Sequence, residues 1–242
     1  MAVRYLTIVP LPGRVPHGAE AIGRAAPWFP AVGLGLGVVL AVVERATSLL
    51  FPSLLAALLT VTAWKLLTGG LHLDGLADCL DGLVGRDAAH RLAIMGDSRI
   101  GAFGAIGLIL FLLLEIAAVA ELPSDVRWRA LLVIPAVARA TPALLARLFP
   151  AAKAEGHGAA FRAGARVVAA PVALALALVA AAAILGAAGL LATAAALLAA
   201  LALAWFMTAR LAGITGDVLG AAIEVAELAA LLTLSAWAHV RL

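Results

Sequence analysis

The chain has few charged residues and a single cysteine. Only 13% of its 242 residues are charged, whereas 65% are hydrophobic and the mean hydropathy is +1.12. Apolar residues make up only about 45–50% of a typical soluble domain. The scarcity of charge therefore excludes an ordinary water-soluble domain and indicates an integral membrane protein.

The lone cysteine and the small net charge exclude two further possibilities. Cys79 has no second cysteine to pair with, so the chain forms no internal disulfide, and we expect its thiol to pack against a neighbouring helix. The net charge is only +3, and the basic residues are spread along the chain and do not cluster with aromatic residues. This distribution argues against nucleic-acid binding.

Long apolar runs predict an all-α bundle of about seven transmembrane helices that forms one domain over residues 1–242. The expected spans cover residues 28–43, 47–67, 100–120, 130–149, 167–188, 190–209 and 218–238, with a first turn marked by Glu44 and Arg45. When alternate loops are placed on opposite sides, most of the 17 lysines and arginines fall on the side of the N-terminus. The positive-inside rule then predicts a cytoplasmic N-terminus.

An acidic stretch, TGGLHLDGLADCLDG, interrupts this apolar sequence at residues 68–82. On a helix, Asp74, Asp78 and Asp81 would lie within about 60° of one another, with a stripe of leucines on the opposite side. Carboxylates about 6 Å apart repel by roughly 3 kcal/mol per pair at an intermediate dielectric. Three such oxygen donors suit Mg²⁺, so the stretch predicts a metal site; the alternative is a solvated charged turn between helices.

A second acidic face is predicted near the C-terminus, in GITGDVLGAAIEVAELAALL. Asp217, Glu224 and Glu227 would share one side of a helix with small residues, and Thr215 lies just before them. An ionised side chain inside a membrane costs at least about 2.5–3.5 kcal/mol, which favours a binding function. The alternative is a set of acids at a helix end, with small residues that serve only packing.

The segment IMGDSRIGAFGAIG places Asp97, Ser98 and Arg99 directly before a span. Ser98 is expected to cap that helix, so that the first amides and Arg99 form an anion site suited to phosphate. The alternative is that Asp97 and Ser98 are only caps and that Arg99 anchors the helix at the membrane interface.

Two further residues are candidates for function. His72 is a candidate general base, although on a continuous helix it would point away from Asp74, so it contributes only if Gly69 and Gly70 break the helix. Arg139 lies within a span and is expected to pair with an intramembrane acid, with Glu115 as one candidate, or with a substrate phosphate.

Three of these segments, together with the opening RYLTIVPLP, resemble the cobalamin synthase family, adenosylcobinamide-GDP ribazoletransferase. The segments are TGGLHLDGLADCLDGL, IMGDSRIGAFGAIGL and GITGDVLGAAIEVAE, and the matches extend from residue 4 to about residue 227. The resemblance is looser between residues 121 and 212.

The resemblance implies a polytopic, Mg²⁺-dependent enzyme of the bacterial inner membrane with its active site on the cytoplasmic side. It would join adenosylcobinamide-GDP to α-ribazole, or to α-ribazole 5′-phosphate, and release GMP. Asp74, Asp78 and Asp81 would hold the metal, and Asp97 or Asp81 would accept the hydroxyl proton. Substrate contacts are expected from Ser98, Arg99, Arg139, Thr215, Asp217, Glu224 and Glu227. The oligomeric state stays open, with a homo-oligomer as one alternative.

Two alternatives compete with this interpretation. The acidic stretch is also similar to that of CDP-alcohol phosphotransferases, but Leu76 and Ala77 stand where that family has alanine and arginine. An ion-coupled transporter also uses intramembrane acids and broken helices, but it needs a site near the middle of the membrane and often contains a repeat. The acids here gather on one side, and the sequence shows no internal repeat.

Overall fold

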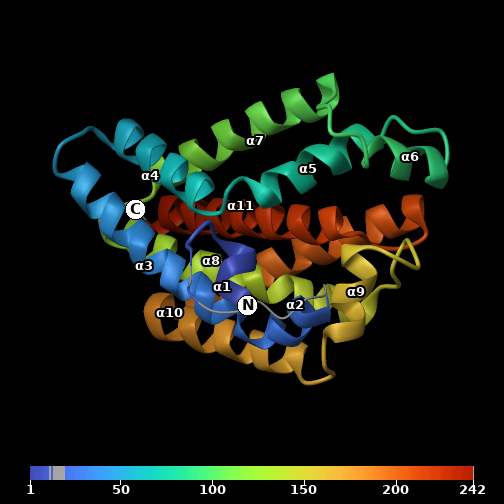
Figure 1. The fold of residues 1–242 in the computed structure, drawn as a ribbon. Helices are drawn as coiled ribbons and strands as arrows, with labels where there is room; N and C mark the ends of the chain where they lie inside the picture. The colour runs from blue at the N-terminus through green and yellow to red at the C-terminus, as the bar shows by residue number, and fades with distance from the viewer. Residues whose placement is uncertain (11, 13–19, 242) are drawn as a thin grey trace.

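The computed structural model describes residues 1–10, 12 and 20–241, and within them it contains helices and no named strand. Figure 1 shows these helices packed as one bundle. They are α1 (Ala2–Leu6), α2 (Glu20–Ala25), the 3-10 helix η1 (Ala26–Trp28), α3 (Phe29–Ser48), α4 (Ser53–Leu67), α5 (Leu71–Gly82), α6 (Ala88–Ile94), α7 (Ala102–Glu121), α8 (Ser124–Leu148), α9 (His157–Gly164), α10 (Ala169–Leu211) and α11 (Gly216–Arg241). The predicted all-α class is confirmed.

Among the described residues, five helical segments are long and apolar enough to cross a membrane: Glu20–Ser48, Ala102–Glu121, Ser124–Leu148, Ala169–Leu211 and Gly216–Arg241. A sixth span is obtained if α4 and α5, which meet at an angle of 90°, are counted as one broken span. The chain is therefore a multi-pass membrane protein.

The long helix α10 contains the fifth and sixth predicted spans, which are joined at Gly186. This glycine has φ 59° and ψ −136°, which is not helical. A Cβ on Gly189 would lie 2.3 Å from the carbonyl oxygen of Ala181, although residues eight apart in a straight helix are separated by about 12 Å. The chain therefore reverses at Gly186, and the two halves of α10 form a hairpin. Counting these halves separately and α4 with α5 as one broken span gives a total close to the predicted seven.

Helix α8 lies at the centre of the bundle and packs against α3, α10 and α11. Its contact with α3 depends on two glycines. A Cβ on Gly37 would lie 2.1 Å from the Leu132 carbonyl oxygen, and a Cβ on Gly33 would lie 2.5 Å from that of Pro135. Small residues therefore let the two backbones touch.

The turn predicted at Glu44 and Arg45 is wrong, because α3 continues to Ser48. Glu44 is only 1% exposed, accepts a hydrogen bond from Ser48 and lies 3.7 Å from Arg127 on α8. The carboxylate is paired across the bundle, so a charged residue at this point of the sequence does not end the helix.

Two features give the bundle a polar end. Gly69 and Gly70 adopt left-handed φ values of 64° and 68°, which end α4 and turn the chain into α5. At the end of the bundle toward which α5 runs, residue 151 pairs with residue 214 in an isolated bridge, which holds the loop after α8 against the start of α11. The acidic stretch, the loop around Asp97 and residues 213–217 therefore gather together, as predicted (Figure 1).

Candidate active site

Helix α5 carries the predicted acidic face, and its three aspartates differ in exposure. Asp74 is exposed, Asp78 is half-buried and Asp81 is 8% exposed. Cys79 is buried among apolar neighbours, as expected. The helical periodicity of the sequence therefore predicted the element and its polar face correctly.

Asp81 faces the N-terminus of α7. One carboxylate oxygen accepts a hydrogen bond of 2.7 Å from the Gly101 amide, and the other accepts one of 2.8 Å from the Gly104 amide. A Cβ on either glycine would lie 2.4 Å from this carboxylate. Asp81 thus satisfies two of the four amides that a helix leaves without partners at its start, and it does so from a different helix.

The expectation that Ser98 caps the following helix is wrong. Helix α7 begins at Ala102, after Gly101, and Ser98 is exposed in the preceding loop. The amides at the start of α7 bind the Asp81 carboxylate instead. The anion site predicted at this helix terminus is therefore occupied by a carboxylate of the protein itself.

Asp97 and Arg99 form an exposed ion pair in the loop between α6 and α7. An Arg99 guanidinium nitrogen lies 2.6 Å from an Asp97 oxygen, and the Arg99 amide also donates to this carboxylate. These hydrogen bonds lower the pKa of Asp97 to about 2. Asp97 is consequently a weak base near neutral pH.

A further carboxylate, Asp217, reaches the acidic face from the first turn of α11. A Cβ on Gly75 would lie 2.7 Å from the Asp217 carbonyl oxygen, so α5 and α11 are in close contact here. Asp78 lies within electrostatic range of both Asp74 and Asp217. Thr215 donates a hydrogen bond of 3.1 Å to Asp217 and thereby orients its side chain. Carboxylates from two helices, Asp74 and Asp78 on α5 and Asp217 on α11, therefore lie near one another.

Tyr5, the only tyrosine of the chain, also lies near this group. Burial raises the pKa of Tyr5, and the charge of Asp217 raises it further. Its ring stacks on Phe29 at 6.0 Å between centroids. Nothing in the local sequence around Tyr5 indicates a position beside residues more than 200 places later.

Three cavities border the acidic residues. One, of about 700 Å³, is lined by Asp81, Asp97 and Arg99, and the other two share Met95 and Gly96 as a common wall. The larger of these two, of about 610 Å³, is lined by Asp74, Asp78, Asp97, Ser98 and Arg99, together with apolar residues such as Leu108 of α7. The smaller, of about 260 Å³, is lined by Thr215, Asp217 and Lys153. The lining of the 610 Å³ cavity therefore offers both carboxylates and a guanidinium to a ligand.

Comparison with known proteins shows the family of the chain. The family profile described as Cobalamin-5-phosphate synthase matches residues 1–235. The chain belongs to the cobalamin-5-phosphate synthase family. Similar curated proteins are named adenosylcobinamide-GDP ribazoletransferase. That of Geotalea daltonii is 40% identical over 238 residues, covering 98% of this chain and 96% of the relative, and that of Roseiflexus sp. is 38% identical over 254 residues, covering 100% and 90%. No solved structure matches the chain.

In this member of the cobalamin-5-phosphate synthase family, Glu224, Glu227 and Arg139 lie away from these cavities. All three are at most 1% exposed and belong to a network of ion pairs inside the bundle. Arg139 binds the Glu227 carboxylate, so the suggested pairing with Glu115 is replaced by a partner on α11. This placement favours a role within the helix bundle over the substrate contact that the sequence suggested.

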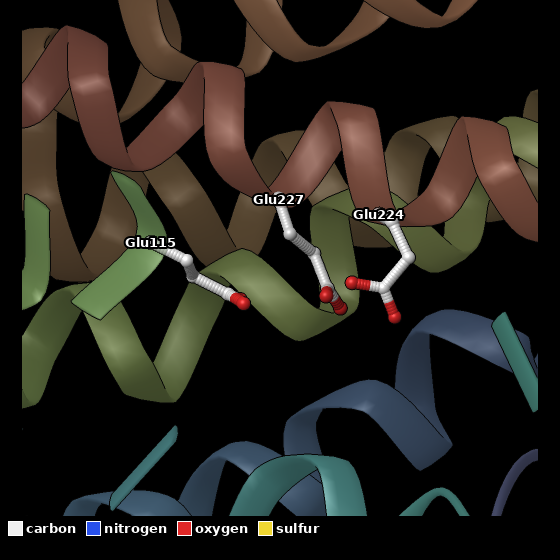
Figure 2. A group of neighbouring side chains, drawn as sticks. All are labelled: Glu115, Glu224 and Glu227. Atoms are coloured by element: carbon white, nitrogen blue, oxygen red, sulfur yellow. The ribbon is translucent and has the colours of Figure 1, made fainter. Parts of the chain in front are cut away.

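Lys65 is the centre of this network and was not identified as a functional residue from the sequence. Its ammonium lies 2.8 Å from Glu115, 2.6 Å from Glu224 and 3.3 Å from Glu227. Figure 2 shows the three glutamates pointing toward one another, Glu115 from α7 and the other two from α11. Their oxygens lie within 4.8 Å of one another, as in a metal site, but the lysine supplies the cation. We refer to Lys65, Glu115, Glu224, Glu227 and Arg139 as the buried ion network.

His72 lies in the first turn of α5 and points away from the acidic face. It is 2% exposed, and neither ring nitrogen has a hydrogen-bond partner among the described residues. Its ring is close enough to Lys65 and Arg139 to feel their charges. The glycine break does occur, but it starts α5 at Leu71 and leaves His72 on the side of the buried ion network.

Proposed function

We propose that this chain is an adenosylcobinamide-GDP ribazoletransferase. It would join adenosylcobinamide-GDP to α-ribazole, or to α-ribazole 5′-phosphate, and release GMP. The observation that carries the proposal is a cavity lined by Asp74, Asp78 and Arg99, with Asp217 close to Asp78 in the adjoining cavity, in a chain that matches the family over residues 1–235. Carboxylates for a divalent cation beside a guanidinium for phosphate suit transfer at phosphorus.

The acidic residues fit Mg²⁺, which prefers oxygen ligands from one or two carboxylates together with substrate phosphates. Asp74 and Asp78 would hold it on α5, with Asp217 as the ligand from α11. Asp81 is less suited than the sequence suggested, because both of its oxygens already accept amide hydrogen bonds. Bound there, the cation would neutralise charge on the diphosphate.

The residues of the chain would bind and orient the two substrates. A ribazole hydroxyl oxygen attacks the phosphorus that carries the cobinamide side, the bond from that phosphorus to the bridging oxygen breaks, and GMP leaves with that oxygen. Arg99 lines the same cavity and would stabilise the negative charge on the departing phosphate. Since Asp97 is a weak base, the hydroxyl proton would pass to a carboxylate on the acidic face of α5.

We place the enzyme in the bacterial inner membrane, with the polar end of the bundle facing the cytoplasm. The bias of lysines and arginines toward the side of the N-terminus supports this orientation. It would also give phosphate-bearing substrates, which do not cross a bilayer, direct access to the acidic face.

The test is turnover by purified protein in liposomes with adenosylcobinamide-GDP and α-ribazole, with and without Mg²⁺. We expect GMP and a cobalamin product in equal amounts, and neither when Mg²⁺ is removed by a chelator. The control is Asp78→Asn in the same liposomes, which should insert and melt normally but release no GMP. Folded wild-type protein that forms no product with either form of ribazole would refute the proposal.

A further inference from the structure

The buried ion network joins four helices, three of them at one ammonium group. Lys65, in the last turn of α4, contacts Glu115 of α7 and both Glu224 and Glu227 of α11. Glu227 in turn binds Arg139 of α8. The lysine and its partners are separated by up to 162 residues, so the network is a tertiary contact that links distant parts of the chain.

Lys65 also takes part in the bend that orients the acidic face. Its carbonyl oxygen accepts a hydrogen bond of 3.0 Å from the Gly70 amide and one of 3.1 Å from the Thr68 hydroxyl. These bonds close the turn at the end of α4, and α5 begins at the next residue, Leu71. The backbone of Lys65 thus holds the bend, while its side chain holds α7 and α11.

The helices that Lys65 connects carry or contact the candidate metal ligands. Asp74 and Asp78 are on α5, directly after the bend, whereas Asp217 is on α11, which carries two of the glutamates that bind Lys65. Asp81 contacts α7, which carries the third. A change in the angle between α4 and α5 would move Asp74 and Asp78 relative to Asp217.

We infer that Lys65 is a positioning residue for the metal site. It acts on that site through the bend between α4 and α5 and does not touch substrate. This inference rests on the proposed function. Residues hydrogen-bonded directly to metal ligands typically change metal affinity by about 10- to 100-fold when replaced, and a residue that acts through a bend is compared with the lower end of that range. Lys65→Met should therefore weaken cation binding at the acidic face at least about tenfold and lower kcat with little change in the KM for α-ribazole.

Arg127 provides a matched control, because it is a buried cation at the opposite end of the bundle. It is 7% exposed, lies 3.7 Å from Glu44 and donates to the Ser53 hydroxyl and to carbonyl oxygens at the end of α7. Arg127→Met removes a similar set of contacts far from the α4–α5 bend. It should lower the melting temperature and leave cation binding unchanged.

The experiment measures two quantities on the full-length protein in liposomes. Binding of Mn²⁺ is titrated by electron paramagnetic resonance, with no substrate present. The distance between spin labels at Leu71→Cys on α5 and Val179→Cys on α10 reports the orientation of α5; both positions are exposed, and the native Cys79 is too buried to be labelled.

We expect Lys65→Met to weaken Mn²⁺ binding and to broaden or shift the label distance, Lys65→Arg to restore both, and Arg127→Met to change neither. If Lys65→Met does not fold, Glu224→Gln, which weakens one of the three contacts, should produce the same changes to a smaller degree. An unaltered label distance in Lys65→Met, or the same change in Arg127→Met, would overturn the inference. If the wild type binds no Mn²⁺, the metal proposal fails separately, and the label distance still tests Lys65.

Discussion

Replacement of Asp81 by asparagine separates its role as a helix cap from a role as a metal ligand. The carboxylate accepts two hydrogen bonds, of 2.7 and 2.8 Å, from amides at the start of α7. Asparagine keeps one acceptor oxygen but places an NH₂ group against the second amide. The substitution therefore removes one charge-assisted hydrogen bond and leaves a buried amide without a partner.

The cost can be estimated from these two effects. A hydrogen bond to a charged group contributes about 1.5–3 kcal/mol, and an unsatisfied buried donor costs about 1–3 kcal/mol. Because the two effects overlap at one amide, we expect Asp81→Asn to reduce the free energy of unfolding by about 2–4 kcal/mol. For a chain of this size, that corresponds to a fall in melting temperature of about 5–15 °C.

The assay pairs thermal unfolding in detergent with Mn²⁺ titration, and the matched variant is Asp74→Asn. Asp74 is exposed, so its replacement should change stability by less than about 0.5 kcal/mol while it weakens Mn²⁺ binding. Asp81→Asn should show the reverse pattern. An Asp81→Asn protein that melts like the wild type but no longer binds Mn²⁺ would refute our reasoning and restore Asp81 as a ligand.

Three further predictions concern other parts of the structure. Asp78→Asn should lower GMP release by at least about 100-fold and leave the melting temperature unchanged. Single-turnover assays and thermal unfolding would check these two results. Normal turnover by the variant would show that Asp78 does not belong to the site. Gly37→Ala should destabilise the protein by more than about 1 kcal/mol, because the new methyl group would lie 2.1 Å from the Leu132 carbonyl oxygen. Gly35→Ala is the control, since a methyl group there would have no neighbour within 4 Å, and it should be neutral or stabilising in the same melting assay. Asp97 keeps its charge at any pH well above its pKa of about 2. Asp97→Asn should therefore leave the acid limb of the pH–rate profile between pH 5 and 8 in place. Loss of that limb would identify Asp97 as the base.

The sequence by itself determined the features that depend on the periodicity of apolar and acidic residues along each helix. The apolar runs predicted the spans, because each span must satisfy its own backbone hydrogen bonds inside the membrane. The spacing of Asp74 and Asp78 placed them on one face of a helix, because helical geometry repeats every 3.6 residues. Gly69 and Gly70 were a possible break before α5, and the structure shows it there, since glycine readily adopts the left-handed backbone that they have.

The partners of each charged residue were decided only by the tertiary structure. Asp81 belongs to the same helical face as Asp74, yet it binds the amides of α7, and Asp217 joins Asp74 and Asp78 from α11. Lys65 appeared to be the polar end of a span, but its three partners lie on other helices. A buried charge needs a partner, and helical spacing says which face a residue occupies but not which helix packs against that face. The pairing therefore follows from how the helices pack.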